Sequence, residues 1–213
     1  ETNKSYENLL RQRRVILETA ERKIKKLDEL LEKEKEKGIE YALIYTTDKK
    51  PEQMEQVNRL LSNKNIVHHR ITDEETSDRG KTENLLKSFQ KGDYKILTAK
   101  RVLDEGVNIP QIKLAYILAS TTVKRQWIQR RGRLLRKCKE IGKTHAVIHD
   151  FVVLPASYKN KTEFENIDSD AKKIVKAEYD RVWEFAKLAE NRYEEDGAMA
   201  VIGILNEVKN ELK

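Results

Sequence analysis

Residues 41–45 read Tyr-Ala-Leu-Ile-Tyr, a short apolar run that decides the fold class. A run of this length without alternation is typical of a strand that is buried on both sides of a sheet. Further strand candidates are residues 66–72, 95–99, 114–119 and 146–153. Continuously apolar strands predict a parallel sheet with helices on both faces, and in such sheets the working residues usually follow the carboxyl ends of the strands.

Helical patterns lie between these strands. Amphipathic helices are expected at residues 51–62, 82–90 and 122–137. Apolar residues from Leu17 to Leu31 recur at steps of three or four and predict one long helix over residues 6–37. We therefore expect an α/β class protein, whose strands and helices alternate along the chain.

The end of the chain has a different pattern. After Pro155 no strand is predicted, and helices are expected at residues 168–192 and 198–212. The sequence thus predicts three parts, which are a long N-terminal helix in residues 1–37, an α/β domain in residues 38–155 and a helical extension in residues 156–213.

Composition restricts the class of protein. The chain has 213 residues, 38% of them hydrophobic and 37% charged, with a net charge of +7. The single cysteine, Cys138, excludes a disulfide framework and predicts a reducing compartment, the cytoplasm. No apolar run reaches the ~18–20 residues of a membrane span, and no signal peptide is recognisable. Because the chain begins with Glu1 in a charged stretch, we expect it to be a piece of a longer protein.

Basic residues gather in residues 121–139, which read T-T-V-K-R-Q-W-I-Q-R-R-G-R-L-L-R-K-C-K. No acidic residue occurs in this stretch until Glu140 follows it. Like charges this dense repel one another, so an anion is expected nearby. The basic residues are Lys124, Arg125, Arg130, Arg131, Arg133, Arg136, Lys137 and Lys139.

Helical spacing sorts this segment into faces. Gln129, Gly132, Arg133 and Arg136 lie at i, i+3, i+4 and i+7, which places them on one side of a continuous helix. Two guanidinium groups on one face suit a polyphosphate, which they can bind through charge-assisted hydrogen bonds. On spacing alone, a basic helix that touches a nucleic-acid backbone, or only solvent, is the alternative.

The rest of the helix is expected to face the protein. Ile128, Arg131 and Leu135 fall on another face, which we expect to dock on the sheet together with Trp127. Gly132 in a helix interior costs ~1 kcal/mol relative to Ala, so we expect another backbone to approach it closely.

Two Gly-Lys-Thr tripeptides, at residues 80–82 and 142–144, imitate the end of a phosphate-binding P-loop. The P-loop pattern also needs an earlier glycine, but Glu75 and Lys137 occupy those positions. We interpret both tripeptides as turns.

A second informative stretch, residues 95–110, reads K-I-L-T-A-K-R-V-L-D-E-G-V-N-I-P. It passes from a predicted strand into a loop and precedes the strand that leads to the basic helix. Taken together, I-L-T-A-K-R-V-L-D-E-G-V-N-I-P and Q-R-R-G-R-L-L-R resemble motifs V and VI of superfamily-two helicases. Residues 41–48 resemble motif IV, and H-D-F-V-V-L-P resembles the strand that follows motif VI in bacterial DNA helicases and restriction-type translocases.

This resemblance implies a RecA-like fold and a set of nucleotide contacts. Gln129 would sense ATP, and Arg133 and Arg136 would act as arginine fingers on the γ-phosphate. Gly106 would allow the loop to approach the nucleotide, and Asn108, where most relatives have Asp, would approach the ribose. Arg130 is also assigned to the nucleotide contacts.

The resemblance also implies nucleic-acid contacts at the strand ends. Phosphates of one nucleic-acid strand would be contacted by Thr46, Thr47, Thr98, Lys100 and Arg101. Such contacts recognise the nucleic-acid backbone and not its base sequence. The style of the motifs favours DNA in repair or restriction systems over RNA, although RNA is not excluded.

An N-terminal RecA-like lobe normally supplies the P-loop lysine, the acidic pair that holds Mg²⁺ and the catalytic base. The sequence shows none of them, so the chain by itself is expected neither to hydrolyse ATP nor to unwind nucleic acid. The alternatives are a non-enzymatic nucleic-acid-binding module that uses the basic helix, an RNA helicase lobe and a nucleotide-dependent transferase with a similar sheet.

Overall fold

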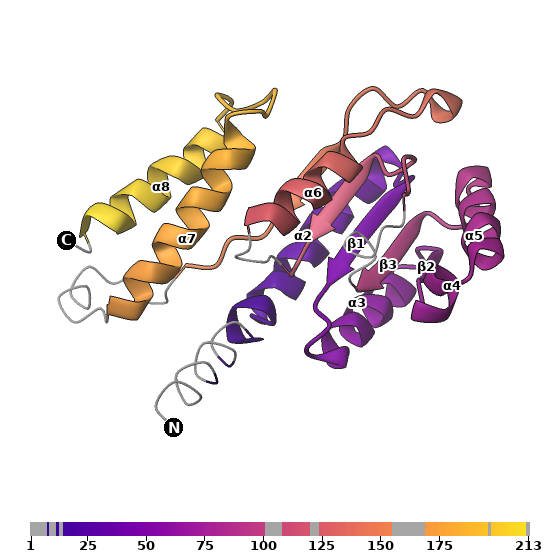
Figure 1. The fold of residues 1–213 in the computed structure, drawn as a ribbon, viewed down its shortest axis with the longest axis horizontal. Coiled ribbons are helices and arrows are strands. Elements are labelled where there is room, and N and C mark those ends of the chain that lie inside the picture. Colours follow the sequence, from indigo (N-terminus) through magenta and orange to yellow (C-terminus); the bar gives the residue numbers. More distant parts are fainter. Residues whose placement is uncertain are drawn as a thin grey trace. The chain divides into compact units, whose positions relative to one another are not determined.

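The computed structural model describes residues 8, 12, 15–100, 108–119, 124–154, 169–195 and 197–211. It divides into two compact units, residues 1–151 and 152–213. Unit 1 contains a five-stranded sheet in the order β2-β3-β1-β4-β5 (Figure 1). Its strands are β1 (Ala42–Thr46), β2 (His68–Arg70), β3 (Ile96–Lys100), β4 (Leu114–Ile117) and β5 (Val147–Asp150).

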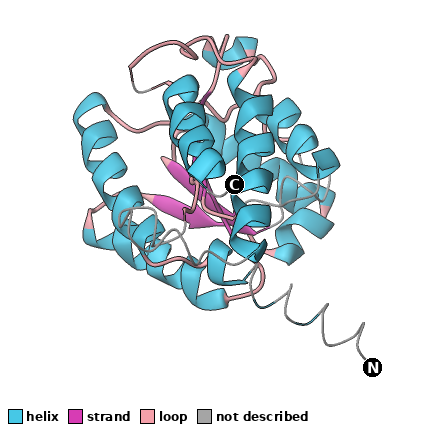
Figure 2. Ribbon diagram, turned by 90° about the vertical axis from the view of Figure 1, so that its left-hand side faces the viewer, coloured by secondary structure: helices cyan, strands magenta, loops and turns pink. Residues whose placement is uncertain are grey.

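All neighbouring strands of this sheet are parallel, which confirms the predicted sheet type. Central strand β1 is in register with β3 through Ala42 opposite Ile96 and Thr46 opposite Lys100. All five residues of β1 are buried. The strands of the sheet are drawn as magenta arrows among cyan helices in Figure 2.

Helices cover both faces of the sheet, as predicted. Alternate strand residues point to opposite faces, so each face has its own apolar cluster. On one face, α5 (Arg79–Lys91) and α6 (Lys124–Leu134) contribute Phe89 and Leu134. On the other face, α2 (Arg22–Lys37) and α3 (Pro51–Asn63) contribute Leu27, Leu31, Val57 and Leu61.

The prediction of one uninterrupted helix over residues 6–37 is wrong. Residues 15–18 are helical, but Thr19 is in a turn and Ala20 is not helical, and α2 starts at Arg22. Thr19 donates its hydroxyl to the Val15 carbonyl, and the Lys23 amide bonds to the Ala20 carbonyl only three residues back. Periodicity misses this break because the apolar stripe continues through it.

The segment before α5 also differs from the prediction. The strand predicted over residues 66–72 covers only His68–Arg70, and residues 73–77 form the short helix α4 (Asp73–Ser77). Thr72 and Glu75 form a capping box that satisfies backbone amides at its start. Asp78 then caps α5 by accepting from the Lys81 amide, so Gly80 lies in a helix and not in the predicted turn.

Unit 2 contains two helices, α7 (Ser169–Ala186) and α8 (Ala198–Glu211). α7 ends several residues earlier than predicted, and α8 begins at residue 198 as predicted. They pack against each other through Val175, Val182, Ile202, Leu205 and Val208. The two helices therefore share a small core of their own.

Candidate functional site

The residues predicted to contact nucleic acid lie where β1 and β3 end. Thr46, Thr47 and Thr98 are at most 1% exposed. The Thr98 hydroxyl donates to Asn58 Oδ1 at 2.9 Å, and the Thr46 hydroxyl donates to the Ala99 carbonyl at 3.4 Å. Both hydroxyls are therefore engaged with protein, and the contact with nucleic acid stays a prediction.

Thr47 belongs to a polar network that sequence reasoning missed. Its hydroxyl donates to Glu18 Oε2 at 2.6 Å, and Lys49 Nζ lies 2.8 Å from Glu18 Oε1. Gln53 Oε1 accepts from the Thr47 amide, and Gln53 Nε2 donates to the Glu18 carbonyl. Glu18 is only 5% exposed. A carboxylate of the chain itself is therefore buried at the carboxyl end of β1 and bound by Thr47 and Lys49.

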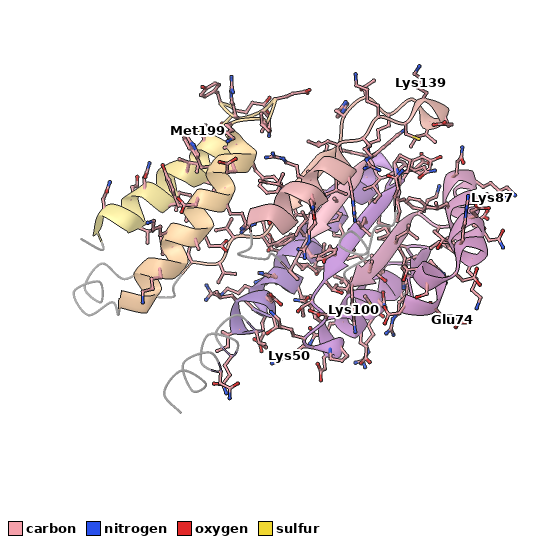
Figure 3. The ribbon with its side chains drawn as sticks, viewed as in Figure 1. Lys50, Glu74, Lys87, Lys100, Lys139 and Met199 are labelled. Carbon is pink, nitrogen blue, oxygen red and sulfur yellow. The ribbon has the colours of Figure 1, made fainter. Side chains whose placement is uncertain are left out.

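Lysine side chains surround the same edge of the sheet. Lys100 follows directly on the buried part of β3 and is half-buried. Figure 3 shows Lys50 and Lys100 at one end of unit 1, where β1 and β3 end. Arg101 lies outside the described residues.

The basic helix ends earlier than predicted. α6 stops at Leu134, and the Arg136 amide bonds to the Arg133 carbonyl in the following turn at 3.3 Å. Arg136 is therefore not on the helical face that carries Gln129 and Arg133. Gln129 is exposed and Arg133 is half-buried.

The docking face of α6 is also not the predicted one. Ile128 and Leu135 are 37% and 41% exposed, whereas Leu134 is fully buried and Arg130 is 7% exposed. The Arg130 guanidinium lies 4.3 Å from the Tyr45 ring centroid and donates to the Ala119 carbonyl at 3.2 Å. A cation–π contact lets an arginine occupy a docking position that sequence patterns reserve for apolar residues.

Arg130 therefore anchors α6 to the sheet, and its assignment to the nucleotide stays a prediction. The expected close approach to Gly132 is not seen among the described residues, none of which, outside the helix backbone itself, has an atom within 4 Å of where its Cβ would be. The outer surface of α6 is open at this point among the described residues.

The loop of residues 108–113, which leads into β4, meets the end of the basic segment. Arg136 Nη1 donates to Asn108 Oδ1 at 2.6 Å, and both side chains are exposed. This contact joins residues from the two stretches that resemble motifs V and VI. Gly106 lies outside the described residues.

Lys143 is a second feature that sequence reasoning missed. It is 3% exposed, and its ammonium donates to the Leu134 carbonyl at 2.7 Å and the Pro110 carbonyl at 3.0 Å. Burial lowers its pKa to about 8, because the interior disfavours the charged form. Its only signal was the second Gly-Lys-Thr tripeptide, in which Gly142 does form a turn, with φ of 63°.

We expected the candidate residues to gather at the carboxyl edge of the sheet. Instead they occupy two separate places. α6 joins the carboxyl end of β4 to the amino end of parallel strand β5, so it runs back along the sheet. The Lys113 amide bonds to the Tyr41 carbonyl just before β1, which places the end of the Asn108 loop near the amino edge. The Arg136–Asn108 contact therefore lies away from Thr47 and Lys100.

Metal and membrane features were also searched for in the described part of the chain. It contains no cluster of three or more His, Cys, Asp or Glu side chains that could hold a metal ion. None of its helices is long and apolar enough to cross a membrane.

Comparison with solved structures places this fold in a known class. The C-terminal part of the Fun30 ATPase domain superposes with a TM-score of 0.51 at 18% identity, covering 89% of this chain and 54% of that one. T4 UvsW superposes with a TM-score of 0.56 at 17% identity, covering 83% and 35%. At these identities the likeness shows the fold, which is that of a RecA-like helicase C-terminal lobe.

Sequence comparison identifies the family. The profile of the Helicase conserved C-terminal domain matches residues 9–138, more than half of the chain. The chain belongs to this family and is a superfamily-two helicase C-terminal lobe. A stretch of 61 residues is 41% identical to DNA 3'-5' translocase XPB2 of Sulfurisphaera tokodaii, covering 29% of this chain and 14% of the relative. The chain thus spans a small part of that relative's length.

Proposed function

We propose that this chain is the C-terminal lobe of an ATP-dependent DNA helicase or translocase. In this role it supplies one wall of a nucleotide cleft, and an N-terminal RecA-like lobe supplies the other. The observation that carries the proposal is the Arg136–Asn108 contact at 2.6 Å, which brings the two predicted nucleotide-binding stretches together at an exposed position. Family membership and the similarity to a DNA translocase support it.

The charge and exposure of the residues near this contact suit a nucleoside triphosphate. Arg136 and Arg133 carry permanent positive charge, which would stabilise the negative charge that builds on the γ-phosphate during transfer. The exposed amide of Gln129 and the open surface over Gly132 leave room for a ligand beside them. Asn108 would orient Arg136 and meet the ribose.

Mg²⁺ would accompany ATP and neutralise part of its phosphate charge. The resemblance implies that the other lobe holds most of the Mg²⁺ ligands. This chain's own residues would bind and orient the phosphates. The acidic pair and the catalytic base would come from the first lobe, since neither is recognisable here.

We place the nucleic-acid strand at the carboxyl edge, on Thr46, Thr47, Thr98, Lys100 and Arg101. Lysines at this edge would neutralise phosphates, whereas the buried hydroxyls would act through the backbone they hold in place. Binding would then be independent of base sequence and would weaken as salt rises. DNA is favoured over RNA by the translocase relative, and a role in repair or restriction is suggested by the motif style. The single cysteine favours a reducing compartment, the cytoplasm.

The test compares this chain alone with a longer protein in which it follows a first lobe. We expect the chain alone to show no ATP turnover above background with Mg²⁺ and single-stranded DNA. The longer protein should hydrolyse ATP, and DNA should stimulate it. Robust turnover by the chain alone would contradict the proposal, and salt-sensitive DNA binding that ignores nucleotide in both proteins would favour the non-enzymatic binding module.

A further inference from the structure

Lys143 is a buried lysine with an unusual set of partners. Its ammonium is held by two backbone carbonyls, and no ion pair with a carboxylate is found for it within the described part of the chain. A buried charge is costly unless its hydrogen bonds are made, so a lysine persists in such a place only where the bonds it makes matter.

The two carbonyls belong to the two segments that carry the candidate nucleotide residues. Leu134 is the last residue of α6, directly after Arg133 and two residues before Arg136. Pro110 lies two residues after Asn108 in the loop that leads to β4. One ammonium therefore joins the loop to the end of the helix.

The position of the ammonium at the helix end adds an electrostatic reason. The last carbonyls of a helix have no partner within the helix and carry partial negative charge, which attracts a cation. The Lys143 backbone is itself held in place by paired hydrogen bonds with Cys138, whose amide and carbonyl both take part. Residues 138–143 thus form a turn whose two ends are hydrogen-bonded to each other. From this turn the Lys143 side chain reaches the Pro110 carbonyl in the loop of residues 108–113.

We propose that Lys143 is a positioning residue that holds the Asn108 loop against the end of α6, so that Arg136 and Asn108 meet. It touches neither of these side chains itself and acts through Pro110 and Leu134. The inference rests on the proposed function only for the role of the Arg136–Asn108 pair in nucleotide binding. The positioning can be measured without nucleotide.

The test uses nuclear magnetic resonance and amide hydrogen exchange on this chain and its K143M variant, which removes the donor and keeps a long side chain. We expect the side-chain amide signal of Asn108 to shift and the Ile112 and Arg136 amides to exchange about tenfold faster or more, the size expected for losing hydrogen bonds from a charged donor. Amides of β1 should keep their protection. K143R, which retains donors, should restore part of the wild-type signal.

K139M is the matched control, because Lys139 is an exposed lysine near the same turn and should leave these signals unchanged (Figure 3). An unchanged Asn108 signal in K143M, or a uniform loss of protection across the sheet, would overturn the proposal. If K143M is too unstable to study, K143L, which also removes the donor and keeps an apolar side chain in the buried site, takes its place with the same two outcomes.

A second readout separates this inference from the proposed function. In the longer protein, K143M should lower kcat for ATP by about tenfold and leave the KM for DNA unchanged, since Lys143 lies away from the carboxyl edge. Faster exchange without a change in kcat would support the positioning role and count against the nucleotide role of Arg136 and Asn108.

Discussion

The carboxyl edge of the sheet and the end of α6 use their polar residues in opposite ways. At the carboxyl edge the Thr46, Thr47 and Thr98 hydroxyls are buried and bonded to protein, and the Glu18 carboxylate already holds Thr47 and Lys49. At the end of α6, Gln129, Asn108 and Arg136 are exposed. An anion can reach the second place directly, whereas at the first it would compete with an anion of the chain itself.

In the proposed function, the carboxyl edge would therefore contribute to nucleic-acid affinity, and the end of α6 would contribute to ATP hydrolysis. There, Arg133 and Arg136 would act on the phosphate that a neighbouring lobe delivers. A lysine paired to a buried carboxylate has its charge already neutralised, and it gains from a phosphate only what the carboxylate gives up. Substitutions in the two regions should therefore differ in both the size and the sign of their effects.

The largest expected effect is at the end of α6. In the longer protein, R136A should reduce ATP turnover by on the order of 10³-fold or more, because an arginine finger stabilises the charge of the transition state. Turnover is measured at saturating ATP and DNA, with circular dichroism to show that the fold is intact. R59A is the control, since Arg59 is an exposed arginine of α3 that pairs only loosely with Glu55 at 3.8 Å. Near-normal turnover in R136A would end the arginine-finger assignment.

A second prediction concerns Lys143 and the pH dependence of stability. Its folded pKa is lowered to about 8, so between pH 7 and 9 the native chain loses this proton while the unfolded chain keeps it. The free energy of unfolding should therefore rise with pH, by about 1 kcal/mol over this window. Urea unfolding at pH 7 and 9 measures this gain.

K143M should lack this gain, and K139M should retain it. The Cys138 thiol lies across the paired backbone from Lys143, but burial raises its pKa, with its hydrogen bond to Glu140 as a further cause, so it stays protonated over most of this range. The same pH slope in wild type and K143M would show that Lys143 does not titrate in this window.

The smallest expected effect is at the carboxyl edge, and its sign is opposite to that of R136A. E18Q removes the carboxylate charge that neutralises Lys49, and glutamine can still accept a hydrogen bond from Thr47. We expect this chain to bind single-stranded DNA about threefold more tightly, with a slope of log affinity against log salt steeper by about 0.7, the value for one more phosphate contact. Fluorescence anisotropy over a salt series measures both.

The control for this prediction is E21Q, because Glu21 is an exposed acid three residues further along the chain. E21Q removes one negative charge, as E18Q does, without touching the Thr47 network. Equal gains in E18Q and E21Q would mean that only overall charge matters, and the carboxyl edge would no longer be distinguished from the rest of the surface.

Sequence patterns predicted the layers of this molecule well. The five strands, the parallel sheet and the helices between them followed from apolar runs and periodicity, because burial of apolar surface dictates those patterns. The two stretches that resemble motifs V and VI meet in space through Arg136 and Asn108. Neither reasoning placed the end of α6 or its docking face.

The misses share one physical origin. Arg130 looked like a surface cation but lies on the Tyr45 ring, and Ile128 looked like a core residue but is exposed. Glu18 and Lys143 are charged residues with buried partners far away in the sequence, and periodicity carries no information about such partners. A buried charge is recognised only from what surrounds it.

For this protein, the sequence by itself determined the class of fold, the succession of strands and helices along the chain, and the two motif stretches. These features depend on local patterns of apolar and basic residues. Only the tertiary structure decided which charged side chains face an incoming anion and which hold the chain together. The reason is that the cost of a charge depends on its solvation and its partners, and here those partners come from elements distant in the chain.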